Sequence, residues 1–310
     1  MADDRSQREW IDRIRRSSVP SDELVEKNCP VCGRSDRRPL IIERGYPLWR
    51  CIACSHVYIS PRPSERWIGA LYATNYMPDS DTEQDWEHDL DRIFEATARA
   101  IRDYHPGGGD LLDVGAGFGG FLIRAREDGW RLHGIEPNAA AFAVAKRRLG
   151  DAADLQESMF ETARLQPQSY DGIVMMNVIE HVCEPLETCR RAYELLRPGG
   201  FLGLRWPQMS TKNLFRERIK GSKETDRAVI GAPVHMHDYT RRSMETLLAR
   251  SGFQDVRHAW AGTRRLANPT VKARIGAAVT TGVAYAVHRL TGGRRITPVV
   301  ARLSLGRKPT

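Results

Sequence analysis

Short apolar runs alternate with amphipathic stretches through most of the chain after residue 107, which predicts strands alternating with helices. The expected strands are rich in apolar residues and cover residues 111–114, 132–135, 153–159, 170–176, 201–204, 254–259 and 299–305. This order indicates an α/β fold with a central sheet. Ligands of such sheets bind at the carboxyl ends of the strands.

A glycine-rich turn follows the first predicted strand. Gly115, Gly117 and Gly120 match the pattern G-x-G-x-x-G, and Glu136 closes the next apolar run at the distance expected of a ribose-binding acid. Asp113 distinguishes two cofactors. Its carboxylate would repel a dinucleotide pyrophosphate at the helix N-terminus, whereas it suits the ammonium and sulfonium of S-adenosylmethionine. The turn therefore favours the methyl donor over a nicotinamide cofactor.

Two segments here resemble motifs of the class I methyltransferases. The run Leu112-Asp113-Val114-Gly115-Ala116-Gly117-Phe118-Gly119 is similar to their first motif, and Gly134-Ile135-Glu136-Pro137 to their second. The resemblance implies a seven-stranded, Rossmann-like α/β sheet that binds S-adenosylmethionine. The cofactor contacts predicted from the motifs and the strand ends are Asp113, Gly115, Gly117, Gly119, Glu136, Ser158, Met159, Met176 and Asn177. For Ser158 and Met159 the alternative is ordinary packing in the core and a turn.

Four cysteines form two pairs ahead of this domain. Cys29 and Cys32 are separated from Cys51 and Cys54 by 18 residues, a spacing typical of a tetrahedral zinc site. Four thiolates leave no open position on the metal, so the zinc would be structural. The alternative is a set of reduced thiols without metal.

The segment after the cysteines resembles a bacterial group of methyltransferases that carry a zinc ribbon before the catalytic domain. The resemblance rests on Val57-Tyr58-Ile59-Ser60-Pro61-Arg62-Pro63-Ser64, and on Leu71-Tyr72. Many members of the group act on sugars, nucleotide-linked sugars or lipid-linked intermediates. The predicted division of the chain is a polar arm (1–19), a zinc ribbon (20–62), a helical linker or lid (63–106), the Rossmann-like domain (107–262), and a basic amphipathic insertion with the last strand (263–310).

Three histidines are predicted catalytic residues, and His235 or His181 is the expected general base for a hydroxyl acceptor. The segment Asn177-Val178-Ile179-Glu180-His181 resembles a region that supplies metal ligands in quinone O-methyltransferases, but Asn177 replaces the leading acid. His181 is therefore expected to orient substrate or accept a proton, or merely to be hydrogen-bonded beside the cofactor. His235 matches a substrate-facing family position, and His237 lies on the same side if the stretch is extended. No third ligand for a His-x-His metal site is visible in the sequence.

The positive charge of the chain is concentrated near its end. The net charge is +8, and residues 263–310 hold ten Lys and Arg and no Asp or Glu, which leaves −2 for the remainder (8 − 10). Residues 275–287 carry no charge and place Ile275, Val279, Val283 and Val287 on one helical face. This stretch is too short to span a bilayer, and it suits a helix packed on the core or one lying on an anionic membrane through residues 263–298.

These features together predict methyl transfer from S-adenosylmethionine to oxygen or carbon of a small glycosyl or lipid-linked acceptor. A cytoplasmic enzyme is expected, because no apolar run reaches the length of a membrane span and residues 1–10 lack a basic start, with peripheral contact to the inner face of the membrane left open. One alternative is an RNA base methyltransferase. The ribbon lacks interleaved aromatic and lysine residues, which disfavours nucleic acid. The other alternative is a non-catalytic scaffold of the same fold.

Overall fold

The structure, a computed structural model, describes residues 19–75, 83–262 and 301–310, together with residues 279, 282–283, 285–287 and 290–291. The predicted arm up to residue 18 and most of the basic segment 263–298, Ile275 included, lie outside the described residues. No helix within the described ranges is long and apolar enough to cross a membrane.

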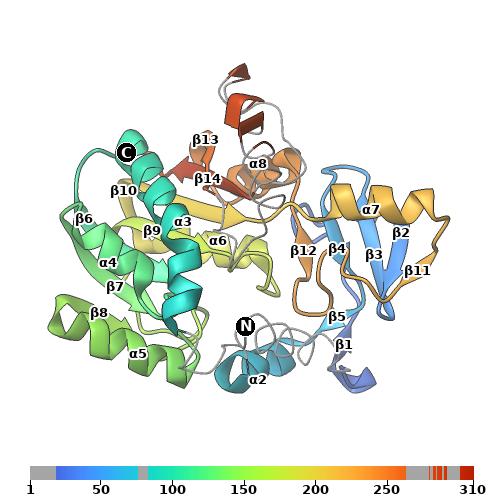
Figure 1. The fold of residues 1–310 in the computed structure, drawn as a ribbon, viewed down its shortest axis with the longest axis horizontal. Coiled ribbons are helices and arrows are strands. Elements are labelled where there is room, and N and C mark those ends of the chain that lie inside the picture. Colours follow the sequence, from blue (N-terminus) through green and yellow to red (C-terminus); the bar gives the residue numbers. More distant parts are fainter. Residues whose placement is uncertain are drawn as a thin grey trace.

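A seven-stranded sheet confirms the predicted α/β fold (Figure 1). Its strands in chain order are β6 (Gly109–Val114), β7 (Trp130–Ile135), β8 (Ala153–Gln156), β9 (Tyr170–Met176), β10 (Leu196–Trp206), β13 (Gln254–Trp260) and β14 (Arg302–Arg307). The spatial order is β13-β14-β10-β9-β6-β7-β8, in which β14 alone runs antiparallel to its neighbours. The third predicted strand is shorter than expected and ends at Gln156.

Helices cover both faces of this sheet. Successive residues of a strand point to opposite sides, so each strand presents apolar side chains to the helices on both faces. The helices are α3 (Glu83–Tyr104), α4 (Gly120–Arg126), α5 (Ala139–Leu149), α6 (Pro185–Leu195) and α8 (Arg241–Arg250). Leu112 and Ile173 belong to a buried cluster that includes residues of α6 and α8. Their neighbours Leu111 and Val174 belong to a second cluster that includes residues of α3 and α4. The strands are therefore buried on both faces, as their continuous apolar runs require.

A second, five-stranded sheet combines distant parts of the chain. Residues of the predicted ribbon form β2 (Arg37–Glu43), β3 (Tyr46–Cys51) and β4 (Val57–Ile59), and the edges are completed by β11 (Glu224–Thr225) and β12 (His237–Asp238), in the order β11-β2-β3-β4-β12. The small strands β1 (Leu24–Val25) and β5 (Arg62–Pro63) pair separately, and α2 (Glu65–Asn75) follows. Figure 1 shows α7 (Ser210–Ile219) lying beside this sheet. The polar stretch 207–232, which follows β10, thus builds onto the ribbon.

Candidate active site

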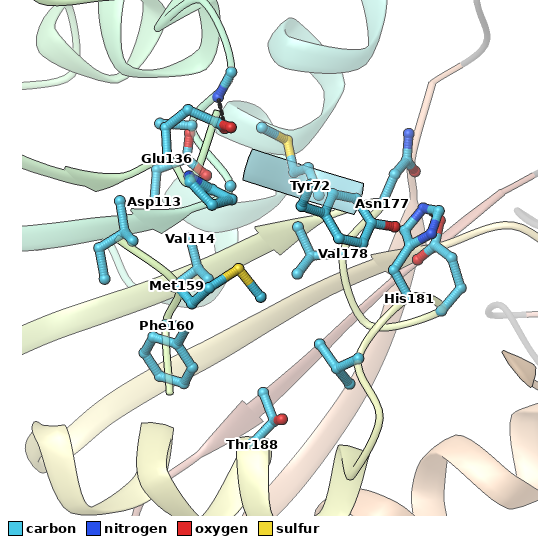
Figure 2. Close-up of a pocket in the computed structure, with 18 of the residues that line it drawn as sticks. Tyr72, Asp113, Val114, Glu136, Met159, Phe160, Asn177, Val178, His181 and Thr188 are labelled. Atoms are coloured by element: carbon cyan, nitrogen blue, oxygen red, sulfur yellow. Dashed lines mark hydrogen bonds and ion pairs between the residues drawn. The ribbon is translucent and has the colours of Figure 1, made fainter. Parts of the chain in front are cut away.

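A cavity of about 1180 Å³ opens at the carboxyl ends of β6, β7, β9 and β10. The predicted site residues that line it are Asp113, Gly115, Gly117, Glu136, Met159, Met176, Asn177, His181 and His235. Asp113, Glu136 and Met159 lie toward one end in Figure 2, and Asn177 and His181 toward the other. The cavity therefore has two ends of different chemistry.

Two buried carboxylates characterise the first end. Glu136 accepts hydrogen bonds from the backbone N–H of Gly117 (2.8 Å) and of Asn138 (2.9 Å). Asp113 is 1% exposed, and its Oδ1 has no hydrogen-bond partner. Burial first, and the nearby charge of Glu136 second, raise the pKa of Asp113 well above its usual value. Burial also raises the pKa of Glu136. Two such carboxylates call for a cation between or beside them.

The turn between Asp113 and α4 can form only with glycine at several positions. Gly115, Gly117 and Gly119 have φ values of +74°, +56° and +82°, in the left-handed region. A Cβ at Gly115 would lie 2.7 Å from Cγ2 of Val178. Gly119 is the N-cap residue just before α4 and does not line the cavity, and a Cβ there would meet Leu149 at 2.8 Å. Its role is therefore to pack α4 against α5.

The proposed cofactor site fits S-adenosylmethionine, because Asp113 Oδ1 is a buried hydrogen-bond acceptor that receives no hydrogen bond. The ammonium and sulfonium of this molecule supply the positive charge that the carboxylate pair lacks, and a dinucleotide pyrophosphate would add negative charge instead. Met159 lines the cavity, whereas Ser158 does not; the Ser158 hydroxyl donates to the Met159 carbonyl at 2.9 Å. Ser158 thus supports the turn that carries Met159.

Arg205 and Tyr72 line the second end of the cavity and were not among the predicted site residues. Arg205 is 5% exposed on β10, donates from Nε to the carbonyl of Ala261 at 3.3 Å, and bonds the side chain of Asn177. Asn177 has a φ of +58°, a conformation that asparagine tolerates better than most residues. Arg205 was recognisable as the one charge within the apolar strand 201–206, but its partners were not.

His181 and His235 meet in this end of the cavity. Their rings make an edge contact with centroids 4.4 Å apart. His181 Nδ1 lies 3.1 Å from the carbonyl of Val234, so this nitrogen carries the proton and Nε2 is the basic atom. Burial, followed by the charge of His235, lowers the pKa of His181 well below its usual value. A neutral imidazole is the form needed to accept a proton.

His237 lies outside the cavity lining, which differs from the prediction that it faces substrate with His235. Its Nε2 donates to the carbonyl of Val182 at 2.9 Å, and its Nδ1 lies 3.2 Å from Nε2 of buried His56. β12 begins only at His237, and His235 lies outside this strand, just after the turn at 232–234. His237 instead ties the loop after β9 to the five-stranded sheet.

Glu180 completes a cluster that the sequence did not reveal. Glu180, His181 and His235 each place one potential metal-ligand atom within 4.8 Å of the others. Burial raises the pKa of Glu180 to about 8. Glu180 thus supplies the third ligand group that was missing for a metal site, with His181 in place of His237. These residues could hold a divalent cation or serve acid–base chemistry without one.

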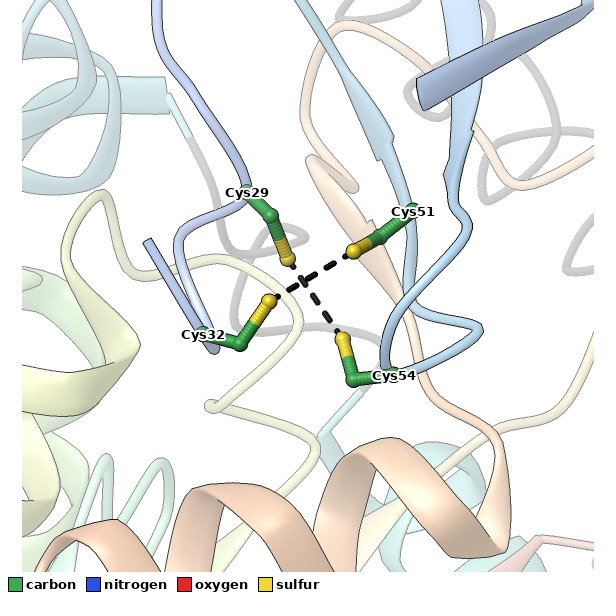
Figure 3. Close-up of side chains that lie close together, drawn as sticks. All are labelled: Cys29, Cys32, Cys51 and Cys54. Carbon is green, nitrogen blue, oxygen red and sulfur yellow. Dashed lines mark hydrogen bonds between the residues drawn. The ribbon is translucent and has the colours of Figure 1, made fainter. Parts of the chain in front are cut away.

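The four cysteines of the two pairs converge at one point of the ribbon (Figure 3). The Sγ atoms of Cys29 and Cys54 are 3.5 Å apart, and those of Cys32 and Cys51 are 3.4 Å apart. A tetrahedral zinc with Zn–S bonds of about 2.3 Å separates its sulfurs by about 3.8 Å, so little adjustment is needed. The hydrogen bond with Cys29 lowers the pKa of Cys54 to about 6. The donor set therefore fits a structural zinc ion.

Comparison with known families identifies the catalytic part of the chain. The model of a family described as a methyltransferase domain matches residues 81–258, more than half of the chain. The chain belongs to this methyltransferase family. The predicted class I domain is thereby confirmed, and the domain is of the type that uses S-adenosylmethionine.

Curated relatives share part of this domain. A ubiquinone biosynthesis O-methyltransferase of Nitrosospira multiformis is 35% identical over 145 residues, which cover 43% of this chain and 56% of that protein. One of the same name from Albidiferax ferrireducens is 30% identical over 166 residues, which cover 49% of this chain and 62% of that protein. The chain thus spans only a little over half the length of these relatives.

Solved structures of the same fold cover more of the chain at lower identity. A 1,6-didemethyltoxoflavin-N1-methyltransferase of Burkholderia thailandensis is 14% identical with a TM-score of 0.51, covering 88% of this chain and 100% of that one. A phosphoethanolamine N-methyltransferase of Haemonchus contortus is 18% identical with a TM-score of 0.51, covering 82% of this chain and 63% of that one. These likenesses establish the fold.

Proposed function

We propose that this methyltransferase transfers the methyl group of S-adenosylmethionine to oxygen or carbon of a small glycosyl or lipid-linked acceptor. The observation that supports this proposal most is a cavity with a pair of buried carboxylates, Asp113 and Glu136, at one end and neutral His181 at the other. The curated relatives named O-methyltransferases support transfer to oxygen of a small molecule. The cavity volume of about 1180 Å³ is ample for a cofactor together with an acceptor.

The donor is assigned to the carboxylate end of the cavity. Asp113 would receive the ammonium group of the methionine part, and Glu136 the ribose hydroxyls. Met159 would contact the adenine, while Met176 and Asn177 would flank the methionine arm. These assignments follow from the strand ends at which the side chains lie.

The chemistry at the other end is proton removal during an in-line displacement. When bound, S-adenosylmethionine supplies the methyl group on a positively charged sulfur. His181 Nε2 accepts the proton of an acceptor hydroxyl as its oxygen forms the new bond to the methyl carbon; the carbon–sulfur bond breaks and leaves neutral S-adenosylhomocysteine. His235 orients the acceptor from its edge contact with His181. Alignment and exclusion of water contribute the rest of the rate acceleration.

The direct experiment is to incubate extracted metabolites and lipids with labelled methyl donor. Once an acceptor is found, His181→Gln is expected to lower kcat by about 100- to 10,000-fold, because the general base is lost. The dissociation constant for the donor should stay unchanged. His258→Gln, at a buried histidine on β13 outside the cavity, is the matched control. Full activity of His181→Gln would refute His181 as the base. Activity abolished by chelators and restored by a divalent cation would replace the base mechanism with a metal at Glu180, His181 and His235.

We also propose that the cysteine cluster holds structural zinc at Cys29, Cys32, Cys51 and Cys54. A closed set of four thiolates offers no position for substrate, so the ion would stabilise the five-stranded sheet and take no part in the reaction. The RNA alternative receives no support from the cavity, whose lining includes the apolar residues Leu90, Ile93 and Phe94.

The basic segment 263–298 is proposed to contact anionic membrane. Within the described residues, Val279 and Val283 are 60% and 57% exposed, as expected of an unpacked apolar face. Val283→Asp should therefore reduce cosedimentation with anionic vesicles while the folded domain and donor binding are retained. If the wild type remains in the supernatant at low salt, the segment belongs to the protein core instead.

A further inference from the structure

Three arginines converge on one face of the five-stranded sheet. Arg38 of β2 and Arg50 of β3 are direct partners in the antiparallel register, so their side chains share one face. Burial chiefly, and then the charges of Arg38 and of Arg218 on α7, lower the pKa of Arg50. Asp238 is the one acid that opposes this effect. Like charges placed directly opposite each other destabilise a sheet, so the cluster has a cost within the isolated protein.

Apart from this effect of Asp238 on Arg50, the described part of the chain offers no compensation for the cost. Neither Arg38, Arg50 nor Arg218 forms an ion pair with a described residue, and Arg50 Nε is buried without a hydrogen-bond partner. By contrast, buried Arg62 contacts a carboxylate, that of Glu184. The cluster is therefore suited to an anion that the described residues do not supply.

An apolar ridge borders the arginines. Phe215 and Ile219 are 67% and 72% exposed and lie one helical turn apart on α7. Leu214 of the same helix is buried against the sheet. At about 100° per residue, Arg218 falls between the buried side of the helix and the side that carries Phe215 and Ile219. The positive charges and the exposed apolar side chains thus form one continuous surface.

The acid of α7, Glu217, does not face solvent. Glu217 is 3% exposed and pairs with Arg216 and with Lys220. Single exposed apolar residues are ordinary, but a large apolar pair flanked by cations is the pattern of a helix that lies in a membrane interface. RNA would require aromatic side chains for base stacking, and this surface has only Phe215.

We propose that the surface formed by Arg38, Arg50, Arg218, Phe215 and Ile219 docks the protein on an anionic phospholipid membrane. The arginines bind lipid phosphates at headgroup level, and Phe215 and Ile219 insert into the boundary with the acyl chains. We call it the docking surface.

The docking surface lies close to the cavity along the chain. Pro207 and Met209 line the cavity, and α7 begins at the next residue, Ser210. Phe215 is therefore about 9 Å along the helix from the cavity edge. A lipid-linked acceptor could enter the cavity from the membrane. That consequence rests on the proposed function, whereas docking itself does not.

The test is flotation of the full-length protein with vesicles of phosphatidylcholine, with and without about 30 mol % phosphatidylglycerol. The wild type should bind the anionic vesicles and be released by salt. The triple variant Arg38→Gln, Arg50→Gln, Arg218→Gln should bind about 100-fold more weakly, since each cation near the surface contributes about fivefold. Phe215→Ser with Ile219→Ser should weaken binding about 10-fold or more with all charges retained.

Matched controls separate docking from general charge. Arg218→Gln should cost about fivefold, whereas Arg126→Gln, at an exposed arginine in the last turn of α4, should cost nothing. Val25→Ser, at an exposed apolar residue of β1, is the control for the ridge. Affinity for S-adenosylmethionine, unchanged in every variant, verifies that each is folded.

Three outcomes would overturn the proposal. One is a wild type that ignores anionic vesicles at low salt. Another is binding that Val283→Asp abolishes and the docking-surface variants leave intact. The third is arginine-dependent binding of an RNA oligonucleotide without vesicle binding. Methylation of a freely soluble acceptor, with vesicle binding intact, would contradict only the lipid-linked acceptor.

Discussion

Replacing Asp113 with asparagine is expected to weaken the binding of S-adenosylmethionine by about 10- to 100-fold, the equivalent of a lost hydrogen bond to a charged group. At the same time the unliganded protein should be as stable as the wild type or more stable. The physical reason is that the Asp113 carboxylate is buried without a partner on Oδ1, which costs folding energy until a cation binds. Calorimetry of donor binding and thermal unfolding measure the two effects.

Asp110 provides a matched control three residues earlier on β6. Its carboxylate is paired with Arg131, Arg197 and His133, and the hydrogen bond from Arg131 is the main cause that holds its pKa below the usual range. Asp110→Asn should therefore lower stability and leave donor affinity unchanged, the reverse of Asp113→Asn. Equal effects of the two changes on donor affinity would contradict the assignment of Asp113.

The raised pKa of Asp113 also fixes the sign of a pH effect. Folding favours its protonated form, so its contribution to stability is complete below pH 3.8 and is lost as pH rises through the higher pKa of the folded state. Donor binding needs the ionised form and should weaken as pH falls through that same raised pKa. Asp113→Asn should remove both dependences. Unliganded stability and donor affinity, each measured across pH, provide the check.

Removing zinc should have the largest effect on stability. Zinc binding by four thiolates contributes on the order of 10 kcal/mol in small domains, and loss of one ligand is expected to forfeit roughly half of this. Cys51→Ser should then lower Tm by about 10 to 20 °C. In the fraction that stays folded, affinity for the methyl donor should change little, because Asp113 and Glu136 lie in the cavity at the seven-stranded sheet, away from the cysteines. Metal analysis should find about one zinc per chain.

Cys189→Ala is the control for the cysteine experiment. Cys189 is fully buried on α6 and lies outside the four-cysteine cluster, so the variant should keep its zinc and lose only the stability of one small cavity. Metal-free wild-type protein with unchanged Tm would refute the zinc assignment. Equal losses in Cys51→Ser and Cys189→Ala would attribute the effect to packing.

The donor end of the cavity was predictable from the sequence because it is built from short contiguous segments. Asp113 lies near the end of β6, the glycines at 115 and 117 are in the turn after it, and Glu136 directly follows β7. Parallel neighbours bring such positions together at one edge. The cysteine cluster was predictable for a similar reason. Each Cys-x2-Cys pair is a local turn, and only the meeting of the two pairs depends on β2 and β3.

The acceptor end was predicted less well because its residues depend on pairings between distant segments. His235 and His237 were expected to act together, yet His237 binds the Val182 carbonyl and His56 because β12 pairs with β4. Nothing near residue 237 in the sequence encodes that partner strand. Arg205 likewise stood out only as an isolated charge, and its position beside Asn177 follows from the register of β9 and β10.

The sequence alone therefore determined the α/β order, the donor motif and the cysteine pairs, since each is written in local periodicity or spacing. Tertiary structure alone decided that residues 224–225 and 237–238 complete the ribbon sheet, and that Arg38, Arg50 and Arg218 share one face. The physical reason is that strand partners and register are fixed by burial of a whole apolar face, to which residues more than 150 positions apart contribute.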